Sequence, residues 1–378
     1  MSTLPELLKE AGDISADPRG KLDAYLSDGR KAVGCMPYFC PEELVHAAGM
    51  VPFGVWGAQT QVSEARRYLP AFICSIVQTT LELGIRGKYD GLSAIMIPIL
   101  CDSLKSMDGN WRYGVKEIPV IPVAHAQNRK IHAGSVFTAS QYRKTLSQLQ
   151  EISGKDVSDD EINKSIALYK NRNAAVRRFM EELSGRPAAL SATERCAVLK
   201  SGYFTDVVEY TSLVTSIADC LAALPVQDSA RTRLVTCGII ADNTGLLSIL
   251  DDCGVSIVDD VVSHESLRYR FDAPDNDDPV MSLALMIGEV EGCPVLYDPG
   301  KKRADMLADV VRQRNADGVL FVMTKFCDPE EYDIVPLKKI LDREGIRLLV
   351  VEVDQQTTDL GQVRTAVETF CEIVHRTL

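Results

Sequence analysis

Short apolar runs alternate with amphipathic stretches in two separate parts of this chain. In the first part, residues 50–57 predict a strand and a turn, and residues 91–99 and 120–126 predict two further strands. Apolar positions at helical spacing predict helices at residues 43–49 and 75–87, and residues 102–114 are expected to form a short helix or a loop. Because strands that alternate with helices form parallel sheets covered on both faces, we expect such a sheet here.

The same alternation returns after residue 230. Strands are predicted at residues 233–241, 255–260, 319–323 and 346–353. Helices are predicted at residues 243–254, 302–318, 335–345 and 361–378. Residues 271–279 (FDAPDNDDP) are rich in Asp and Pro and are expected to form a loop or lid. This part therefore also predicts a doubly wound sheet, in which ligands bind beyond the carboxyl ends of the strands.

A helical section separates the two parts. Residues 138–225 lose the strand pattern, and capping boxes at Ser158 with Glu161 and at Ser191 with Glu194 indicate helix starts. The predicted fold class is α/β, with two doubly wound, flavodoxin-like lobes and a helical section between them. The corresponding division of the chain is residues 1–135, 136–230 and 231–378.

Length and charge narrow the possible functions. The chain has 378 residues, which suits two domains, and its net charge is −12. An acidic chain without basic runs is a poor partner for nucleic acid or an anionic membrane. The longest apolar run, AIMIPIL, is too short to span a bilayer, and the first residues lack the pattern of a signal peptide. We therefore expect a soluble, cytoplasmic protein.

Most of the eleven cysteines are expected to be small buried hydrophobic residues. No CxxC pair occurs, and nothing indicates a disulfide framework. Cys35 and Cys40 have a spacing found in some iron–sulfur sites, but the further close cysteine of those sites is missing. Six others fall within predicted helices, a strand or turns: Cys196, Cys220, Cys237, Cys253, Cys293 and Cys371.

Three cysteines lie where predicted strands end or helices begin. Cys74 precedes the helix at residues 75–87, and Cys101 and Cys327 follow predicted strands. The partial positive charge at a helix start favours a thiolate, or an anionic cluster held by thiolates. Two interpretations stay open, namely buried hydrophobic residues or ligands of one shared metal site. For a shared site, iron–sulfur is favoured over zinc, because a structural zinc site normally has a closely spaced pair.

Several segments together resemble a known family. They are GCMPYFCPEELVHAAGMVPFGVWGAQ (34–59), FICSIVQTTLELG (72–84), PILCDSLKSM (98–107) and TKFCDPEEYDIVPLKKILDREGIRLLVVEVDQQ (324–356). In content and order they are similar to the smaller, β-type subunit of the (R)-2-hydroxyacyl-CoA dehydratases of the lactyl-, 2-hydroxyisocaproyl- and phenyllactyl-CoA type. Those are oxygen-sensitive lyases of anaerobes that ferment amino acids. The resemblance extends over nearly the whole chain.

The resemblance implies a cofactor and partners. Its ligand positions fall on Cys74, Cys101 and Cys327, which would hold a [4Fe–4S] cluster with a non-cysteine fourth ligand in the cleft between the lobes. A larger homologous α-subunit would bind the acyl-CoA substrate, and an ATP-dependent iron–sulfur activator would supply one electron. That electron makes a ketyl radical anion of the thioester, which expels hydroxide on the way to a 2-enoyl-CoA. This subunit would relay or store the electron.

Alternatives within the resemblance also remain. One is a double-cubane cluster reductase or a benzoyl-CoA reductase-like subunit, and another is a non-catalytic subunit whose cluster is structural. No glycine-rich phosphate loop is present in the sequence, so ATP hydrolysis by this chain is not expected. The motif GVWGAQ is expected to form a tight turn near the cluster.

A few further residues lie close to these segments. Glu42–Glu43 and Glu330–Glu331 are interpreted as acids in the first turns of helices rather than as an acid–base pair. His46 and His125 are interpreted as structural. For Trp56 and Trp111, core packing and shielding of a cluster remain equally open.

Overall fold

Strands β1 to β4 form one parallel sheet. The computed structural model describes residues 2–37, 39–226 and 230–375. The strands are β1 (Ala32–Cys35), β2 (Val51–Gly54), β3 (Ala94–Ile99) and β4 (Val120–Ala124), in the order β2-β1-β3-β4. Along β3, Ile95 and Ile97 belong to one hydrophobic cluster, and Ala94 and Met96 to another. Successive side chains of a strand point to opposite faces, so the sheet is covered on both.

A second parallel sheet repeats this topology. Its strands are β5 (Thr232–Gly238), β6 (Val255–Val262), β7 (Gly318–Met323) and β8 (Leu348–Glu352), in the order β6-β5-β7-β8. Both sheets therefore run from the second strand through the first and third to the fourth, which makes β3 and β7 counterparts. Leu234 and Leu320 face the cluster that includes helices α10 (Thr244–Asp252) and α14 (Gly361–His375). Val235 and Phe321 face α12 (Arg303–Gln313) and α13 (Asp328–Arg343).

The remaining helices cover the first sheet and join the two halves. The first part of the chain contains α1 (Leu4–Ala16), α2 (Pro18–Ser27), α3 (Glu42–Ala47), α4 (Ser75–Ile85), α5 (Asp102–Gly114) and α6 (His132–Ser153), with a 3₁₀ turn at Ala65–Arg67. The middle contains α7 (Asp159–Ser184), α8 (Ala192–Ser201) and α9 (Val207–Ala222). A second 3₁₀ turn, Ser266–Tyr269, and helix α11 (Pro279–Glu289) complete the chain.

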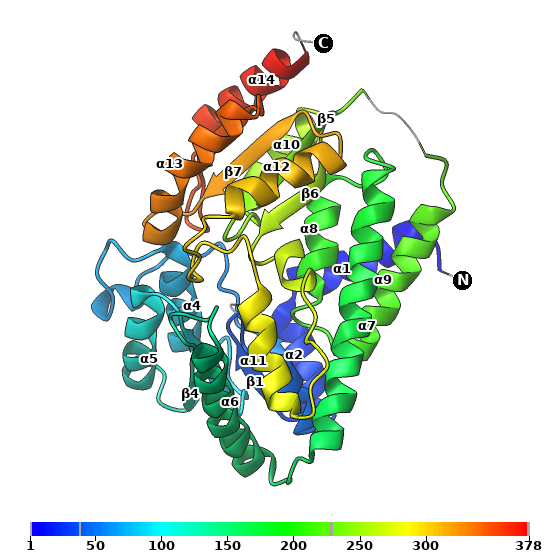
Figure 1. Cartoon of the computed structure of the whole chain (residues 1–378). Helices are drawn as coiled ribbons and strands as arrows, with labels where there is room; N and C mark the ends of the chain where they lie inside the picture. Colours follow the sequence, from blue (N-terminus) through cyan, green and yellow to red (C-terminus); the bar gives the residue numbers. More distant parts are fainter. Residues whose placement is uncertain (1, 38, 227–229, 376–378) are drawn as a thin grey trace.

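Two helices cross between the halves. Helix α1 packs on α8 and α9, and these lie beside α7 along one side of the molecule (Figure 1). Helix α11, although it follows β6 in sequence, packs on α6 and contributes Leu283 and Ile287 to the hydrophobic cluster beneath the first sheet. The predicted α/β class with two parallel sheets is confirmed. The three-part division of the chain stays a prediction.

Most of the predicted helices and strands are present, but several begin or end at other residues than predicted. The predicted capping boxes at Ser158 and Ser191 begin α7 and α8. Of residues 50–57, expected to form a strand and a turn, the strand covers Val51–Gly54, and the chain then leaves the sheet and places Trp56 in the core. The helix expected at residues 335–345 begins earlier, at Asp328, since proline is tolerated in a first helical turn. Residues 376–378 of the predicted last helix lie outside the described residues.

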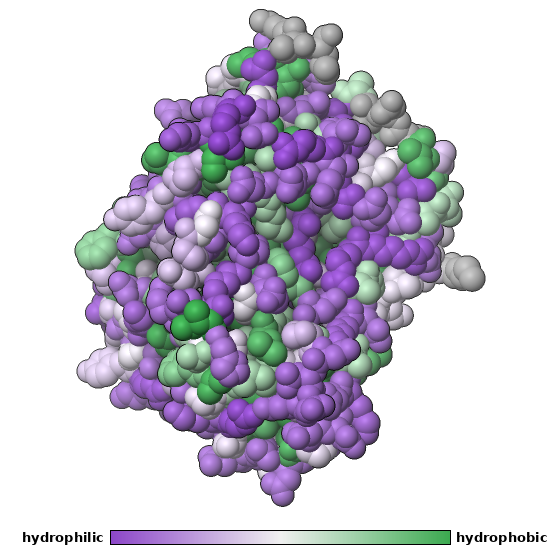
Figure 2. Space-filling view, viewed as in Figure 1, coloured by the Kyte–Doolittle hydropathy of each residue, from purple (hydrophilic) through white to green (hydrophobic). Residues whose placement is uncertain are grey.

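Residues 102–114 form a complete helix rather than a loop, because Leu104, Met107 and Trp111 place one apolar face in the core. The face seen in Figure 2 is largely hydrophilic, in keeping with the acidic composition. Within the described part of the chain, no helix is both long and apolar enough to cross a membrane.

One buried carboxylate connects three parts of the fold. Asp242, which follows β5, accepts hydrogen bonds from Trp56 Nε1 and from Lys200 Nζ, each at 2.6 Å. Trp56 follows the first sheet's β2 and Lys200 lies on α8, so the carboxylate joins both lobes and the helical section. His264, after β6, packs edge-on against Trp56 with ring centroids 4.1 Å apart. Its Nδ1 donates to the Ile239 carbonyl at 2.7 Å.

This junction predicts a pH-dependent stability difference. Burial lowers the pKa of His264 to about 4, whereas the unfolded chain binds that proton near pH 6.5. The folded protein therefore loses stability from this residue as pH falls from about 6.5 to about 4, by up to roughly 3 kcal/mol. A His264→Gln variant has no histidine to protonate here, so its stability does not fall with pH for this reason. The difference in free energy of unfolding between wild type and variant should therefore be smaller at pH 4.5 than at pH 7.

Urea unfolding of both proteins at pH 7 and pH 4.5 measures the effect. Burial raises the pKa of Glu265 to about 7, which gives the opposite pH slope, but this contribution is common to both proteins and cancels in the comparison. A destabilisation that is the same at both pH values would contradict a buried, neutral His264.

Candidate functional site

Each of the three selected cysteines is the N-cap residue of a helix. Cys74 precedes α4, Cys101 precedes α5 and Cys327 precedes α13. All three side chains are half-buried. The prediction that each stands at a helix start is confirmed, and the partial positive charge of a helix start favours negative charge on the sulfur.

The topology explains why cysteines so far apart in sequence contact the same hydrophobic cluster. Cys101 follows β3 and Cys327 follows β7, which are the corresponding strands of the two sheets. Both cysteines and Cys74 pack against the same hydrophobic cluster, which includes Trp56 and, from the second lobe, Ile239. Burial and the nearby Glu330 raise the pKa of Cys327 most, and Cys74 and Cys101 add smaller electrostatic contributions in the same direction. The carboxyl edges of the two sheets therefore share one region.

The protein environment keeps these thiols neutral when no cation is bound. Burial raises the pKa of Cys74 to about 12, and that of Cys327 well above its ordinary value. Burial likewise raises the pKa of Cys101. Backbone N–H groups at the start of each helix oppose these shifts, as those of Val77 and Ile76 do at Cys74. Binding of iron to these sulfurs would therefore release protons.

Three thiols and two nearby hydroxyls are the donors available to the iron–sulfur cluster that the resemblance implies. Among residues 2–37, 39–226 and 230–375, no group of three or more Cys, His, Asp or Glu could hold one metal ion. The thiolates of a cubane bind different irons and lie farther apart than ligands of one ion. The hydroxyls of Ser75 and Thr324, close in sequence to Cys74 and Cys327, are buried and have no hydrogen-bond partner within the described residues. Such orphaned donors suit the sulfur atoms of a cluster.

A buried ion pair holds the loop between β7 and α13, which carries Cys327. Glu330, in the first turn of α13, accepts from Thr324 N at 3.2 Å and from Arg303 Nη2 at 3.1 Å. Its side chain and that of Arg303 are at most 4% exposed. Phe326, which lies between Thr324 and Glu330 in the sequence, adopts φ +61°. This left-handed conformation costs a non-glycine residue about 1 kcal/mol. Glu330 therefore sits in the helix's first turn as expected, but it also holds the cysteine loop in place.

The segment between β1 and α3 has nearly the same sequence as the loop that carries Cys327. Residues 36–43 read MPYFCPEE and residues 323–331 read MTKFCDPEE. Phe39 also has φ +61°, and Glu42 also pairs with buried arginine. Cys40 occupies the place of Cys327, but its sulfur donates to the Met96 carbonyl at 3.6 Å. This local repeat was not recognised from the sequence, although the two aligned FC…PEE strings carry its signal.

A cavity opens beside two of the three cysteines. It has a volume of about 630 Å³, and Ile73 and Ser75, the neighbours of Cys74, contribute to its wall. Phe326, the neighbour of Cys327, and Asp354 line it as well. The cavity gives this part of the site an open side, while the hydrophobic cluster closes the other.

The other residues singled out in the sequence have structural contacts. His46 Nδ1 lies 3.0 Å from Ser165 Oγ, and His125 Nε2 lies 3.0 Å from Tyr142 Oη. Gly57 has φ +77°, and a Cβ there would lie 2.5 Å from Thr79 Oγ1, so this position favours glycine. The tight turn expected here stays a prediction. Trp56 and Trp111 are both buried in the cluster that contacts the three cysteines.

The six cysteines expected to be structural lie on helices, on a strand, at a helix end or in a turn, as predicted. Cys196, Cys237, Cys293 and Cys371 are buried, whereas Cys220 and Cys253 are half-buried. None of the six belongs to the hydrophobic cluster that the other three contact.

Nearly the whole chain matches one known protein family. The chain belongs to the family described as 2-hydroxyglutaryl-CoA dehydratase, D-component, which it matches over residues 37–374. The predicted membership in the 2-hydroxyacyl-CoA dehydratase family, whose enzymes are hydro-lyases, is confirmed. A D-component is one part of an enzyme with at least one further component.

Relatives in this family are similar over their whole length. The chain is 42% identical to the (R)-phenyllactyl-CoA dehydratase beta subunit of Clostridium sporogenes, over 98% of this chain and 100% of that protein. It is 36% identical to the lactoyl-CoA dehydratase subunit beta of Anaerotignum propionicum, over 99% and 100% of the two chains. It is 37% identical to the (R)-2-hydroxyglutaryl-CoA dehydratase, subunit beta, of Acidaminococcus fermentans, over 97% and 98%.

The ion pair behind Cys327 generates a testable prediction. Glu330→Gln leaves the buried Arg303 guanidinium without its closest carboxylate, so the free energy of unfolding should fall by about 3 kcal/mol. Cys327 should also react faster with iodoacetamide in the metal-free protein, because its loop is released. Urea unfolding and mass spectrometry measure the two effects.

Glu331→Gln is the matched control, since Glu331 is the exposed neighbour on the same helical turn. It should change stability by less than about 0.5 kcal/mol. Similar changes in both variants would show that Glu330 has no special role in holding the loop.

Proposed function

We propose that this chain is the β-type subunit of a 2-hydroxyacyl-CoA dehydratase and holds a [4Fe–4S] cluster on Cys74, Cys101 and Cys327. The observation that supports the proposal is that three helix N-cap cysteines, from both halves of the chain, pack against one hydrophobic cluster. Three soft sulfur donors, a helix start at each and an apolar surround are the features that such a cluster requires.

Each part of the site has a role in this proposal. When bound, a cluster of this kind supplies one-electron transfer at low potential. The three thiolates bind iron, while the Ser75 and Thr324 hydroxyls donate hydrogen bonds toward sulfur and thereby tune the potential. The hydrophobic cluster excludes water from one side. Glu330 and Arg303 keep Cys327 in position.

The proposed partners follow from the family. The relatives are beta subunits of dehydratases named for phenyllactyl-, lactoyl- and 2-hydroxyglutaryl-CoA, which share the 2-hydroxyacyl thioester and differ in the acyl group. We therefore propose that this subunit works with a larger α-subunit that binds the 2-hydroxyacyl-CoA. A separate ATP-dependent iron–sulfur activator would deliver the electron, and this subunit would serve as its relay.

Replacement of one ligand tests the proposal. Cys101→Ser should lower the iron content of the anaerobically purified heterodimer by about four atoms, one cluster, because a hydroxyl is a far poorer ligand for iron than a thiolate. Turnover should collapse, while the α-subunit keeps its own cluster and binds acyl-CoA. Iron analysis, anaerobic turnover and circular dichroism of the same sample are the measurements.

Cys196→Ala is the matched control, because Cys196 is buried in α8 outside the cysteine region. It should cost about 1 kcal/mol of stability and no iron. Iron loss in the control would mean that the ligands are wrongly assigned. Full turnover by a folded Cys101→Ser heterodimer lacking one cluster would leave this chain a scaffold rather than a relay.

A further inference from the structure

A second cavity is lined by elements from all parts of the chain and by none of the three cysteines proposed as cluster ligands. The loop after β1 and helix α3 form one wall, and α6, α7, α11 and the segment after β6 form the others. Its volume is about 60 Å³, which is room for roughly four water molecules. A nucleotide or a coenzyme A thioester is far too large for it, but a molecule of a few heavy atoms fits.

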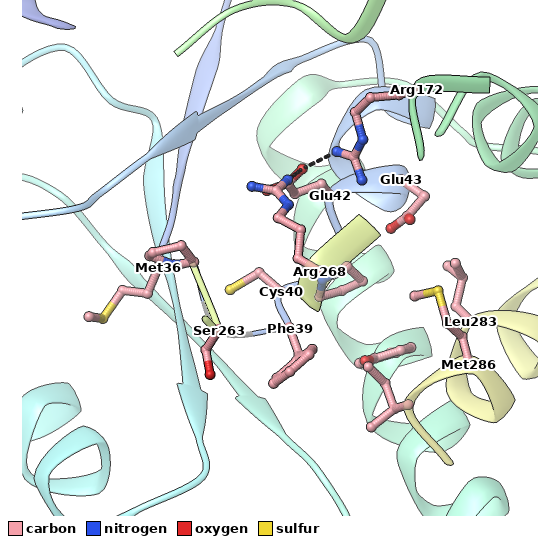
Figure 3. A pocket seen from close by; sticks show the side chains of 14 residues that line it. Met36, Phe39, Cys40, Glu42, Glu43, Arg172, Ser263, Arg268, Leu283 and Met286 are labelled. Carbon is pink, nitrogen blue, oxygen red and sulfur yellow. Dashed lines mark hydrogen bonds and ion pairs between the residues drawn. The ribbon is translucent and has the colours of Figure 1, made fainter. Parts of the chain in front are cut away.

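Two arginines share one carboxylate oxygen in this cavity. Arg172 Nη1 and Arg268 Nη2 both donate to Glu42 Oε2, at 3.1 Å and 2.5 Å, and both side chains are at most 12% exposed (Figure 3). Arg268 Nη1 is buried and has no hydrogen-bond partner in the described part of the chain. A buried N–H group without an acceptor is destabilising, the more so when the group is charged. The cavity thus presents a positive donor that is still unsatisfied.

The surrounding side chains hold this donor in place. The Arg268 guanidinium lies 4.1 Å from the centroid of the Tyr203 ring and 5.2 Å from that of Tyr269. Because stacking and the Glu42 pair fix the guanidinium, little conformational entropy remains to be lost when an acceptor binds. Glu43 also lines the cavity, and its buried carboxyl is the group that competes with an incoming anion.

The other side of the cavity is apolar. Leu283, Met286 and Ile287 of α11 line it, and Figure 3 shows the first two apart from the Glu42–arginine group. A ligand with one anionic end and a short hydrocarbon end matches both sides. We propose that this cavity is a binding site for a small aliphatic monocarboxylate, whose carboxylate accepts from Arg268 Nη1 and whose alkyl chain packs on α11. This proposal does not depend on the cluster.

Such a ligand would join the two lobes. It would contact α3 from the first part of the chain and Arg268 and α11 from the second, so occupancy stabilises the arrangement in which both lie together.

Isothermal titration calorimetry on the full chain tests the site, with propionate as probe and propionamide as its neutral counterpart of equal size. Propionate should bind with 1:1 saturation, and propionamide at least tenfold more weakly, since it lacks the charge that Arg268 recognises. Absence of saturable propionate binding, or equal binding of the amide, would overturn the proposal.

Two variants with opposite expected effects locate the site. Arg268→Gln should weaken propionate binding at least about tenfold, because the charged donor is removed. Glu43→Gln keeps the shape of the side chain but removes the competing carboxylate, so it should tighten binding severalfold. If Arg268→Gln does not fold, Glu43→Gln still decides the matter, since unchanged or weaker binding there places propionate elsewhere.

Discussion

Parallel strands set the constraint on which this structure depends. A parallel sheet must be covered on both faces, so its loops collect functional side chains only at the strand ends. Here two sheets of identical strand order bring those ends to one hydrophobic cluster. Asp242 of the second lobe links the three parts of the chain, since it accepts hydrogen bonds from Trp56 of the first lobe and from Lys200 of the helical section. Cysteines 253 residues apart in sequence, Cys74 and Cys327, contact the same hydrophobic cluster for this reason.

Buried charge is used to hold loops rather than to perform chemistry. The pair of Arg303 with Glu330 holds the loop that contains Phe326. The pairs of Glu42 with Arg172 and Arg268 hold the loop that contains Phe39. Both phenylalanines have a left-handed backbone conformation. A strained loop of this kind persists only where its surroundings fix it. One of these loops belongs to the proposed cluster site, and the other borders the small cavity that we propose as a carboxylate site.

The two sheets could be predicted because short, continuous apolar runs identify buried strands such as β3 and β7. Strand β1 escaped prediction, since its four residues AVGC carry too little hydrophobic pattern. The cysteines were found from their place beside strands and from the family resemblance. Arg303 and Arg268 could not be found in that way, because nothing near them in sequence indicates that they reach Glu330 and Glu42 across the fold.

The central claim is that Cys74, Cys101 and Cys327 hold one iron–sulfur cluster. Anomalous diffraction at the iron absorption edge, on anaerobically grown crystals of the heterodimer, tests it most directly. The account predicts a compact iron peak in this chain within ~2.3 Å bonding reach of all three sulfurs, each bound to a different iron. A well-ordered structure with iron on other cysteines, or with three free thiols and no iron between them, would contradict it.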